Sequence, residues 1–561
     1  MIFQKRTKKI ILYGLCLVFA LLFFFILFIE EIFEFSPPAV EDIESKKKLT
    51  VESHASYKSL ENCWAKEEKG LNFLFLTGDP FVQGWAAGKL MGHRSSQMEE
   101  ALLKRAYDAI NSKAVLWFLC KTGYVLNSDL PDSFPVFMQK EIYGFSSAIE
   151  NLHPELGSPY FRALHYQTAH DLAHQILEKI LSEPGCTSFA AWGSATENGH
   201  LIVGRNFDFE IDGLFDRFKL VQIVHPQKEG IPFISVSWPG MAGVVSGVNR
   251  ELISITLNAA KSDHSAWKGM PVVVMSRLVL QSAATIPQAI SILQSFSSYI
   301  SESFLIADGK TGEVVVVEKT PKLTLLRKPE PSAHTILCTN HFFSPTFQSH
   351  KRHRAFLQEG SSIQRLERLE ELIGRHKGKI SPKIAAEILR DYQFAKDLDF
   401  GMGHLHTINP SLCSHSVIFD LTDGILWVSL GPHQSNSYLA IDIQKILNQS
   451  PDDSCILADK IIPPDPHISP KKIEELQLWH SAVQKWQKQE KKISMEGLEE
   501  CAGILKKYNP RHFLTLVAQG DLLFRQGKAE EAKKLWLDAL ERKPYPDWIQ
   551  KISSRLQPQS P

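Results

Sequence analysis

The sequence lacks both a net charge and a paired-cysteine motif. Its 62 Lys and Arg residues equal its 62 Asp and Glu residues, so no overall positive field favours nucleic acid as a partner. The eight cysteines are spread over 561 residues, and none forms a Cys-x-x-Cys pair. This spacing argues against a zinc ribbon and against a small disulfide-stapled domain, while isolated disulfides stay open. We expect neither a metal nor a cofactor.

One long apolar run lies near the amino terminus. The uncharged stretch Ile10–Ile29 follows Lys5, Arg6, Lys8 and Lys9 and is closed by Glu30, Glu31 and Glu34. About twenty apolar residues in a helix span one bilayer core, and a basic flank stays in the cytosol. We therefore expect a single-pass membrane protein, anchored through residues 10–29, whose remaining chain lies on the extracytoplasmic (periplasmic or lumenal) side. The alternative is a cleaved signal peptide, which has a shorter apolar run and a small-x-small site.

Residues 185–209 place a Gly-Cys junction at the start of a hairpin pattern. One apolar run follows Cys186, a turn is expected at 197–199, and a second run ends at Arg205 and Asp208. In such a hairpin, Arg205 and Asp208 return beside Cys186. A guanidinium favours the thiolate, and a carboxylate can hold an amine or the Arg in place. A lone cysteine is more often a buried small hydrophobe, so the residues alone leave that interpretation open.

The pattern on either side of this hairpin differs. Upstream, Asp79 and Pro80 predict the start of a helix, Gly84 and Gly88 leave one face of it bare, and amphipathic patterns dominate to about residue 182. Downstream, short strands broken by Gly and Pro alternate with helical stretches near 271–296 and 361–394. The order predicts an α+β fold with helices packed on sheets. The expected strands are Phe233–Ser237, Gly243–Val248, Leu252–Leu257, Ser303–Ala307, Val314–Glu318, Ser416–Asp420 and Leu426–Leu430.

Several motifs carry a family resemblance. The sequences Gly185-Cys186-Thr-Ser-Phe and Gly-Arg205-Asn-Phe-Asp208-Phe resemble the cysteine N-terminal-nucleophile (Ntn) hydrolases. The nearest branch is the penicillin acyltransferase-like family (acyl-CoA:6-aminopenicillanic acid acyltransferase), which is related to choloylglycine hydrolase and to the acid ceramidase and N-acylethanolamine amidase group. The resemblance runs from about residue 71 to 445, and its further matches are Gly247–Asn258, Thr339–Phe342 and Ser414–Asp420. Glu251 departs from it, because a glycine is usual there.

The resemblance implies a fold and a set of site residues. The fold would be a four-layer αββα Ntn-hydrolase sandwich. The chain would cut itself between Gly185 and Cys186, and Cys186 would then be the nucleophile. Arg205 would favour its thiolate, and Asp208 would accept hydrogen bonds from the new ammonium group. Asn258 and Asn340 would donate to the oxyanion, each contributing around 3 kcal/mol.

An arginine completes this set of site residues, and its identity is open. The Ser362…Arg365 match indicates Arg365, but Arg352, Arg354 and Arg368 compete for the same role. The new α-amine of Cys186 would be the base near neutral pH, because its reference pKa is about 7.7–8.

The carboxyl-terminal part of the sequence leaves this pattern. Phe513–Pro544 fits a tetratricopeptide repeat, with Gly520, Ala532 and Ala539 at small-residue positions. A generic helical hairpin is the alternative, and a protein partner is possible for this region. The expected domains are 1–35 basic flank and anchor, 36–70 linker, 71–185 helical fragment, 186–445 catalytic fragment, 446–470 Pro-rich linker and 471–561 tetratricopeptide-like tail.

The function expected from these observations is a membrane-anchored, self-processing cysteine amidohydrolase or acyltransferase that acts on N-acylated small molecules through a Cys186 thioester. An idle Ntn-fold scaffold with a protein-binding tail is the first alternative. A papain-like thiol peptidase is the second, but it needs a downstream His and Asn on another fold and gives the Gly185–Cys186 junction no purpose.

Overall fold

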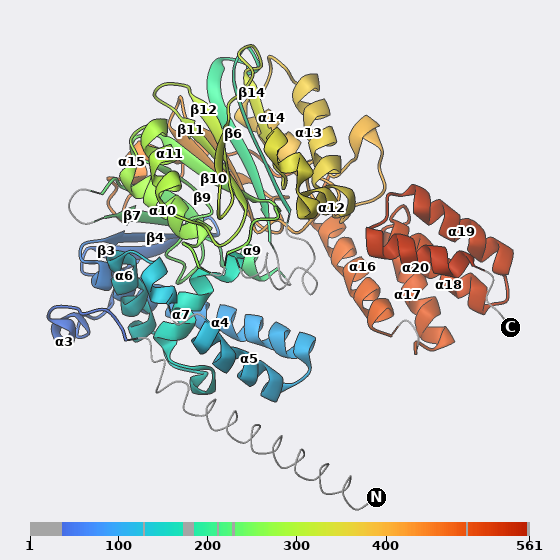
Figure 1. The fold of residues 1–561 in the computed structure, drawn as a ribbon, viewed down its shortest axis with the longest axis horizontal. Coiled ribbons are helices and arrows are strands. Elements are labelled where there is room, and N and C mark those ends of the chain that lie inside the picture. Colours follow the sequence, from blue (N-terminus) through green and yellow to red (C-terminus); the bar gives the residue numbers. More distant parts are fainter. Residues whose placement is uncertain are drawn as a thin grey trace, which may run out of the picture.

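The computed structural model describes residues 36–126, 129–171, 185–209, 213–226, 230–266, 268–489 and 492–557. Helices of the amino-terminal part lie under one face of a pair of stacked sheets, and a helical tail lies beside the sheets (Figure 1). The described fold is therefore α+β, as the sequence predicts.

The two sheets are built mainly from antiparallel strands. The larger one, sheet A, runs in the order β1 (Glu52–Ser53), β2 (Lys58–Leu60), β3 (Cys63–Glu68), β4 (Leu71–Thr77), β7 (Leu220–His225), β8 (Phe233–Ser237), β9 (Ser246–Asn249), β10 (Ile253–Ala259), β11 (Glu302–Asp308), β12 (Val314–Lys319) and β13 (Thr324–Arg327). Sheet B runs β14 (Thr335–Cys338), β5 (Gly185–Gly193), β6 (Gly199–Asp208), β15 (His415–Asp420), β16 (Ile425–Ser429) and β17 (Tyr438–Asp442). Within the described residues, only β4 and β7 pair in parallel.

Helices cover the outer faces of both sheets. Those on sheet A include α4 (Pro80–Ile110), α6 (Val136–Ala148), α7 (Pro159–Gln167), α10 (Val272–Ser282) and α11 (Ile286–Ser295), and those on sheet B are α13 (Ser362–Arg375) and α14 (Pro382–Arg390). The others are α3 (Ile43–Lys46), α5 (Lys113–Leu126), α9 (Leu214–Phe218), α12 (Lys351–Glu359), α15 (Ile443–Ile446), α16 (Pro470–Gln489), α17 (Met495–Tyr508), α18 (Phe513–Arg525), α19 (Ala529–Glu541) and α20 (Pro546–Leu556).

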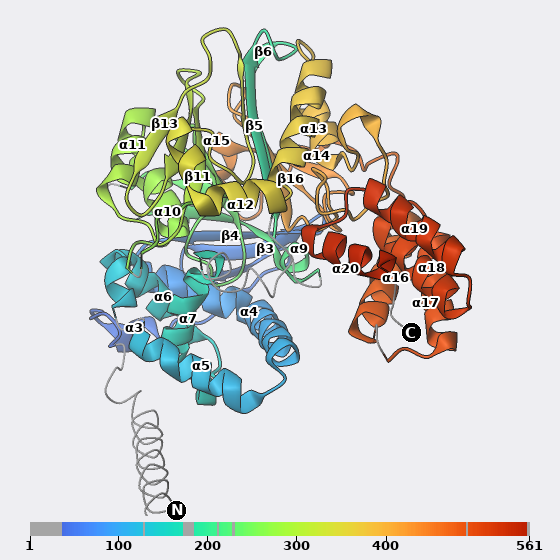
Figure 2. The same cartoon turned by 45° about the vertical axis from the view of Figure 1, so that its right-hand side comes forward.

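The four valines of β12 show how the sequence produces these layers. Side chains alternate between the two faces of a strand, so a run that is apolar at every position is buried on both faces. Val315 and Val317 join the core between sheet A and its helices, whereas Val314 and Val316 join the core between the two sheets. A third core lies between sheet B and α13 and α14. The order of layers is helix, sheet, sheet, helix (Figure 2).

The start of α4 follows the sequence prediction closely. Asp79 accepts hydrogen bonds from the backbone N–H of Phe81 (3.0 Å) and Val82 (3.4 Å), and Pro80 is the first helical residue. The bare face of the helix packs on α6. The approach is so close that a Cβ at Gly84 would lie 1.8 Å from the carbonyl oxygen of Glu141. The backbones of α4 and α6 therefore touch directly.

The expected strands and helices are recovered with small shifts. The strand 233–237 has the predicted bounds, whereas β9 begins at Ser246 rather than at Gly243. Each of the two predicted helical stretches divides into a pair, α10 and α11 or α13 and α14. A capping side chain followed by a proline begins the second helix of each pair, at Thr285 and at Ser381.

Two segments predicted to be linkers are instead part of the sandwich. Residues 36–70 contain β1, β2 and β3. Charged side chains of this segment form hydrogen bonds with distant parts of the chain: Lys66 Nζ donates to Pro451 O (3.1 Å), and Glu68 accepts from Cys455 N (2.9 Å). Residues 446–470 lie against sheet B, where Ile462 bridges Tyr438. The cysteines 63, 186, 338, 413, 455 and 501 are free thiols.

The predicted membrane location is corrected by the structure. Among the helices of the described residues, none combines the length and apolar character needed to cross a bilayer. The segment 10–29, on which the prediction depended, lies outside the described residues.

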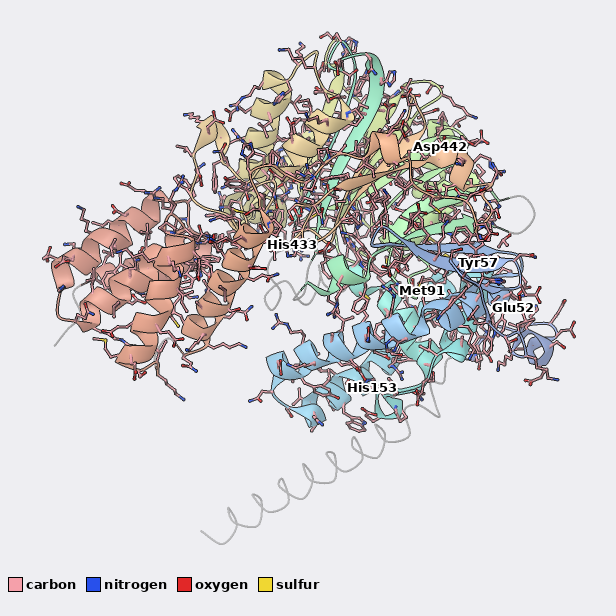
Figure 3. All side chains as sticks on the ribbon, turned by 180° about the vertical axis from the view of Figure 1, so that it is seen from behind. Glu52, Tyr57, Met91, His153, His433 and Asp442 are labelled. Carbon is pink, nitrogen blue, oxygen red and sulfur yellow. The ribbon has the colours of Figure 1, made fainter. Side chains whose placement is uncertain are left out.

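The tail consists of α16 to α20 and has its own apolar core, which includes Trp479, Trp486 and Trp536. It meets the sandwich at the loop that precedes β15, where His404 and His406 lie against His512 and Tyr545. Figure 3 shows His433 on the side of the sandwich next to the tail.

Candidate active site

The hairpin of β5 and β6 brings the predicted residues together. In its register, Gly185 lies opposite Asp208, Cys186 opposite Phe207, and Ser188 opposite Arg205. The turn lies at 194–198 and the Gly-Cys junction lies at the far end of β5, as the apolar runs predict. Cys186 is 2% exposed, so its thiol is buried in the uncut chain.

Arg205 is fixed beneath the thiol. Its Nη2 lies 3.8 Å from Cys186 Sγ and donates to Leu257 O at 2.6 Å. Its Nη1 donates to Ser246 Oγ and to His415 Nε2 (3.2 Å). Because Arg can only donate, His415 Nε2 is an acceptor, so the imidazole is neutral with its proton on Nδ1. Burial and the charge of Arg205 agree with this, since both lower the pKa of His415.

Asn340 and Arg365 hold the backbone of the junction. Asn340 Oδ1 accepts from the backbone N–H of Cys186 (2.7 Å) and from Arg365 Nη2 (2.6 Å). Two donors meet at this atom, which fixes the orientation of the amide. Arg365 Nη1 donates to Cys186 O and to Thr187 Oγ1 (3.0 Å), and Ser361 Oγ accepts from Nε of the same guanidinium (3.2 Å).

The competing arginines lie elsewhere. Arg368 is held by Asp391 at 2.8 Å and Asp397 at 2.9 Å. Arg352 lines a separate cavity, and Arg354 is exposed on α12. Of the four candidates, the structure brings Arg365 to Cys186.

Asn258 faces the same end of the hairpin from β10. Its Oδ1 accepts from Ser188 Oγ, and its Nδ2 donates to Cys338 O at 3.1 Å. The Nδ2 of Asn340 likewise donates to Ala259 O at 3.0 Å. An amide NH₂ carries two protons, so each of these contacts uses only one of them.

Asp208 is a buried carboxyl group beside the junction. A Cβ at Gly185 would lie 3.4 Å from its Oδ2, and neither oxygen has a hydrogen-bond partner within the described part of the chain. The neighbouring thiol of Cys413 donates to His415 O at 3.0 Å. Burial raises the pKa of Asp208 to about 7, against the opposing effect of Arg365 and Arg205.

The thiol of Cys186 is protonated in this uncut state. Burial raises its pKa to about 11, and the charge of Arg205 only partly opposes this. Arg205 thus acts on the thiol in the expected direction, by lowering its pKa, but in the uncut chain the loss of solvent outweighs the guanidinium.

Several site residues were not found from the sequence. Glu302 is fully buried, near enough to Cys186 to raise the pKa of its thiol, and burial raises the pKa of Glu302 itself well above its usual range. Ser246, Ser361 and Ser188 support Arg205, Arg365 and Asn258. No local motif marks these residues, since they come from separate elements. His415 lies in the Ser414–Asp420 match, which could have indicated it.

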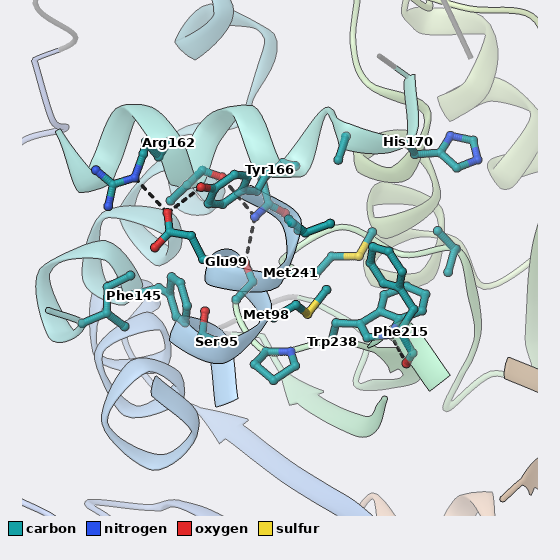
Figure 4. Close-up of a pocket in the computed structure, with 18 of the residues that line it drawn as sticks. Ser95, Met98, Glu99, Phe145, Arg162, Tyr166, His170, Phe215, Trp238 and Met241 are labelled. Atoms are coloured by element: carbon teal, nitrogen blue, oxygen red, sulfur yellow. Dashed lines mark hydrogen bonds and ion pairs between the residues drawn. The ribbon is translucent and has the colours of Figure 1, made fainter. Parts of the chain in front are cut away.

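A mostly apolar cavity of ≈ 110 Å³ adjoins the site (Figure 4). Phe207, which lies opposite Cys186, lines it together with Met98, Phe215, Trp238 and Met241. Glu99, Arg162 and Tyr166 form a polar wall, where Arg162 Nε donates to Glu99 Oε1 at 2.8 Å.

One group of possible metal ligands occurs among the described residues, and it lies away from Cys186. His200 Nδ1 is 2.9 Å from Asp420 Oδ2 and 3.8 Å from Asp423 Oδ1. His200 is at the opposite end of β6 from Phe207, so this group takes no part in the site.

Comparison with known proteins gives an independent line of support. The family model of acyl-coenzyme A:6-aminopenicillanic acid acyl-transferase matches residues 194–434. The match includes Arg205, Asp208, Asn258, Asn340 and Arg365, and it begins after Cys186. It supports similarity to the Ntn hydrolases and acyltransferases.

The curated relatives are distant. An uncharacterized protein of Archaeoglobus fulgidus is 22% identical over 393 residues, 64% of each chain. Protein dcd1B of Dictyostelium discoideum is 24% identical over 242 residues, 39% of this chain and 45% of that one. The chain thus spans less than two thirds of the length of either relative.

Two solved structures show weak likeness. An N-acylethanolamine-hydrolyzing acid amidase ortholog of Caenorhabditis elegans is 19% identical over 42% of this chain and 93% of that one, with a TM-score of 0.31. A variant conjugated bile acid hydrolase from Clostridium perfringens is 13% identical over 48% of this chain and 95% of that one, with a TM-score of 0.33. TM-scores of this size do not establish a shared fold.

Proposed function

We propose that this protein is an Ntn-type cysteine hydrolase or acyltransferase, which cuts itself between Gly185 and Cys186 and then acts on amide bonds of N-acylated small molecules. The observation that carries the proposal is the convergence of Arg205, Asn340 and Arg365 on Cys186, with the unpartnered carboxyl group of Asp208 beside the junction. An idle scaffold has no need of this arrangement.

Self-cleavage would begin with attack of the Cys186 thiol on the carbonyl carbon of Gly185. The acyl group passes from nitrogen to sulfur, and water then hydrolyses the thioester, leaving a carboxylate on Gly185 and a free α-amine on Cys186. The contact of Asn340 with Cys186 N holds the peptide that must be broken, and the contact of Arg365 with Cys186 O holds the next peptide along the chain. Gly185 has no side chain between Asp208 and Arg365 to obstruct the attack.

In the cleaved enzyme, the new α-amine would act as the base. Its reference pKa is about 7.7–8, so a useful fraction is neutral at pH 7 to 8. Asp208, whose oxygens have no other partner in the described chain, would accept hydrogen bonds from the protonated amine. The thiolate of Cys186 would attack the substrate carbonyl, the amine half would leave with the proton, and water or a second amine would resolve the thioester.

Asn258 and Asn340 would stabilise the oxyanion. The second amide proton of each Nδ2 is available for a substrate oxygen, because one proton alone serves the backbone carbonyl. Each such donor contributes around 3 kcal/mol in comparable sites. The apolar cavity beside Phe207 would hold the acyl chain.

We also propose that the domains divide at Cys186 and near residue 470, and that the tail follows the tetratricopeptide pattern. Gly520 supports this pattern, since a Cβ there would lie 2.4 Å from Trp536 Nε1 on the next helix. Ala532 and Ala539 are fully buried between the helices.

The decisive test is intact mass and amino-terminal sequencing of the purified protein beside Cys186→Ala, with Cys455→Ala as a control for loss of a buried thiol away from the hairpin. We expect two fragments, one beginning at Cys186, in the parent and in Cys455→Ala, and a single chain in Cys186→Ala. A single uncut chain in all three would overturn self-cleavage and favour the scaffold function.

A further inference from the structure

The loop that leads into β15, residues 399–414, is buried along almost all of its length. A buried loop is unusual, because each of its backbone N–H and C=O groups needs a hydrogen-bond partner away from water. The tail supplies partners to residues 399–405, and strand β6 supplies partners to residues 408–414. We call residues 399–414 the coupling loop, since it lies between the tail and the hairpin that carries Cys186.

On the tail side, the coupling loop is held by residues next to the ends of tail helices. Asn509, which follows α17, donates from Nδ2 to Met402 O at 2.8 Å. The N–H of Leu405 donates to the hydroxyl oxygen of Tyr545, which precedes α20, at 3.1 Å. A Cβ at Gly401 would collide with Asn509 Oδ1, so the two segments also pack closely. The tail therefore binds the backbone of the loop directly.

An accessible ion pair adds a contact at the edge of this interface. Arg511 Nη1 lies 2.6 Å from Asp399 Oδ2, and the two side chains are 61% and 20% exposed. Asp399 also holds the turn of the loop, because its Oδ1 accepts from Gly401 N at 2.9 Å. Reversing one charge of this pair opposes docking of the tail without removing a side chain from an apolar core.

On the hairpin side, the coupling loop is bonded to the strand that faces Cys186. Asn206 Nδ2 donates to Ile408 O at 3.0 Å, and the N–H of Ser414 donates to Phe207 O at 2.8 Å. Phe207 lies opposite Cys186 in the register of β5 and β6. The loop is therefore separated from the nucleophile by a single strand pairing.

The positions of Arg205 and Asp208 depend on the same stretch of β6. Arg205 lies 3.8 Å from Cys186 Sγ, and Asp208 lies opposite Gly185. Both are chain neighbours of the two β6 residues that bond the loop. Displacement of a reacting group by about 1 Å can slow a reaction roughly 100-fold. A shift of β6 would therefore affect attack on the Gly185–Cys186 bond.

A second connection to the site passes through His406 of the coupling loop. Its ring centroid lies 5.3 Å from that of Tyr545 in the tail. Burial lowers the pKa of His406 to about 4, and the charge of Arg365 adds to this effect, so His406 also lies near the arginine that donates to Cys186 O. The loop thus meets the site from two directions, through β6 and through Arg365.

We propose that the tail positions the residues of self-cleavage, because its contacts with the coupling loop hold β6 where Arg205 and Asp208 flank the Gly185–Cys186 bond. The tail residues that contact the loop are positioning residues, which touch neither the bond nor the thiol and act through the loop. The inference rests on the proposed self-cleavage, and it assigns the tail to the maturation of this chain.

A charge swap tests whether the contact between the tail and the loop sets the cleavage rate. Arg511→Glu places a second carboxylate beside Asp399, and we expect self-cleavage after cell-free synthesis to slow at least about 5-fold. Asp399→Arg/Arg511→Glu restores opposite charges and should recover most of the lost rate. The matched control is Lys485→Glu, which reverses a cation paired with Glu500 inside the tail at 2.6 Å and should cleave at the parental rate.

Hydrogen exchange measures the same coupling without cleavage. In uncut Cys186→Ala, adding Arg511→Glu should make exchange at residues 204–208 and 402–414 at least about 5-fold faster, while β10, β11 and β12 keep their protection. Adding Lys485→Glu should change neither segment. Exchange that quickens equally in sheet A would show a general loss of stability and would overturn the positioning role.

The outcomes separate the inference from the proposed function. Cleavage of Arg511→Glu at the parental rate overturns the inference and leaves self-cleavage standing. The bonds from Asn409 to Asp391 O (2.9 Å) and Arg390 O (3.0 Å) would then hold the loop without the tail. Slow cleavage that the charge swap does not rescue also overturns it, because the contact itself would not be the cause.

A parent that stays uncut overturns the proposed self-cleavage. Exchange at residues 204–208 then decides whether the tail positions β6. Unchanged exchange on addition of Arg511→Glu contradicts that role, and faster exchange confined to β6 and the coupling loop supports it.

Discussion

At the residue scale, the raised pKa of the buried Asp208 carboxyl group makes the stability of the uncut chain depend on pH. Its pKa is raised to about 7 in the uncut chain, whereas an unfolded Asp titrates near 3.9. The folded state therefore holds a proton that the unfolded state releases, and stability is lost as pH rises from about 4 to 7. Above pH 7 the group is ionised in both states, and the cost levels off at roughly 4 kcal/mol.

Asp208→Asn is expected to remove that cost. In the uncut Cys186→Ala background, the free energy of unfolding at pH 8 should increase by a few kcal/mol on substitution, and the gain should fall below about 1 kcal/mol at pH 4.5. Urea titrations at the two pH values measure it. A gain that is the same at both pH values would show that the carboxyl group of Asp208 does not titrate in this range. The matched control is Asp263→Asn, which removes an exposed carboxylate whose pKa is lowered rather than raised.

Arg365 is expected to affect the rate of self-cleavage, because its guanidinium donates several hydrogen bonds around Cys186. Arg365→Lys keeps the charge but cannot reach Cys186 O, Thr187 Oγ1 and Asn340 Oδ1 together. Loss of one charge-assisted hydrogen bond, worth about 1.5–3 kcal/mol, predicts cleavage slower by roughly 10- to 150-fold, and loss of a second bond would slow it further.

A cleavage time course after cell-free synthesis measures this rate, with Arg354→Lys as the matched change on exposed α12. Cleavage of Arg365→Lys at the parental rate would remove Arg365 from the proposed role. A melting temperature close to that of the parent distinguishes slow chemistry from failure to fold.

At the same scale, the sequence could indicate only part of the site. Cys186, Arg205 and Asp208 follow from one local hairpin, whose register is set by its turn. Asn258, Asn340 and Arg365 required the family resemblance, because they come from β10, from the loop after β14 and from α13. Glu302 and Ser246 could not be found from the sequence. No local motif marks them, and their environment arises only from burial in the folded chain.

At the scale of elements, the contact of α4 with α6 depends on glycine. A Cβ at Gly84 would lie 1.8 Å from Glu141 O, whereas a Cβ at Gly92 on the same helix would meet Ile149 Cγ2 at 3.4 Å, an ordinary contact. We expect Gly84→Ala to destabilise the uncut protein by about 3 kcal/mol or more, because backbone must move. Gly92→Ala should be neutral or slightly stabilising, since Ala is the better helix former. Urea titration measures both, and equal effects would contradict the packing of the helices.

Histidines join the tail to the sandwich. His404 of the sandwich lies against His512 of the tail, and His406 lies against Tyr545 of the tail. Burial lowers the pKa of His406 to about 4 and of His512 to about 3. The docked state keeps them neutral, while exposed His titrates near 6.5. Docking is therefore stable above pH 6.5 and weakens as pH falls toward 4, at about 1.4 kcal/mol per pH unit for each His.

Hydrogen exchange of α16 to α20 measures this coupling. We expect protection of the tail to fall between pH 7.5 and pH 5, after correction for the intrinsic rate, and His406→Gln, which cannot gain the charge, to reduce the fall. Protection that is unchanged across this range would contradict the role of the histidines.

The elements that sequence patterns located best are those with local signals, such as the Asp79 cap and the hairpin turn. Residues 36–70 and 446–470 escaped prediction for a physical reason. Their strands and loops carry charged or Pro-rich sequence, and they are ordered by contacts with one another across the fold, such as Lys66 with Pro451 and Glu68 with Cys455. Such pairings cannot be read from either segment alone.

At the scale of the whole molecule, the two halves of the chain are interlocked. β3 and β4 belong to the part before Cys186, yet β4 pairs with β7 of the later part over residues 72–77 and 220–225. A buried ion pair joins Glu141 to Arg277 at 3.0 Å, and Gln167 Nε2 donates to Gly240 O at 2.8 Å. Apolar side chains from both parts fill the core between sheet A and its helices.

These contacts predict that self-cleavage leaves one particle. Separation would expose the edge of β7 and the apolar core, so the fragments are expected to elute together at the volume of uncut Cys186→Ala in size-exclusion chromatography. They should part only in concentrated guanidinium chloride, where the apolar core unfolds. An amino-terminal fragment that elutes alone under native conditions would contradict this prediction, because the parallel β4–β7 pair would then contribute too little to hold the halves together.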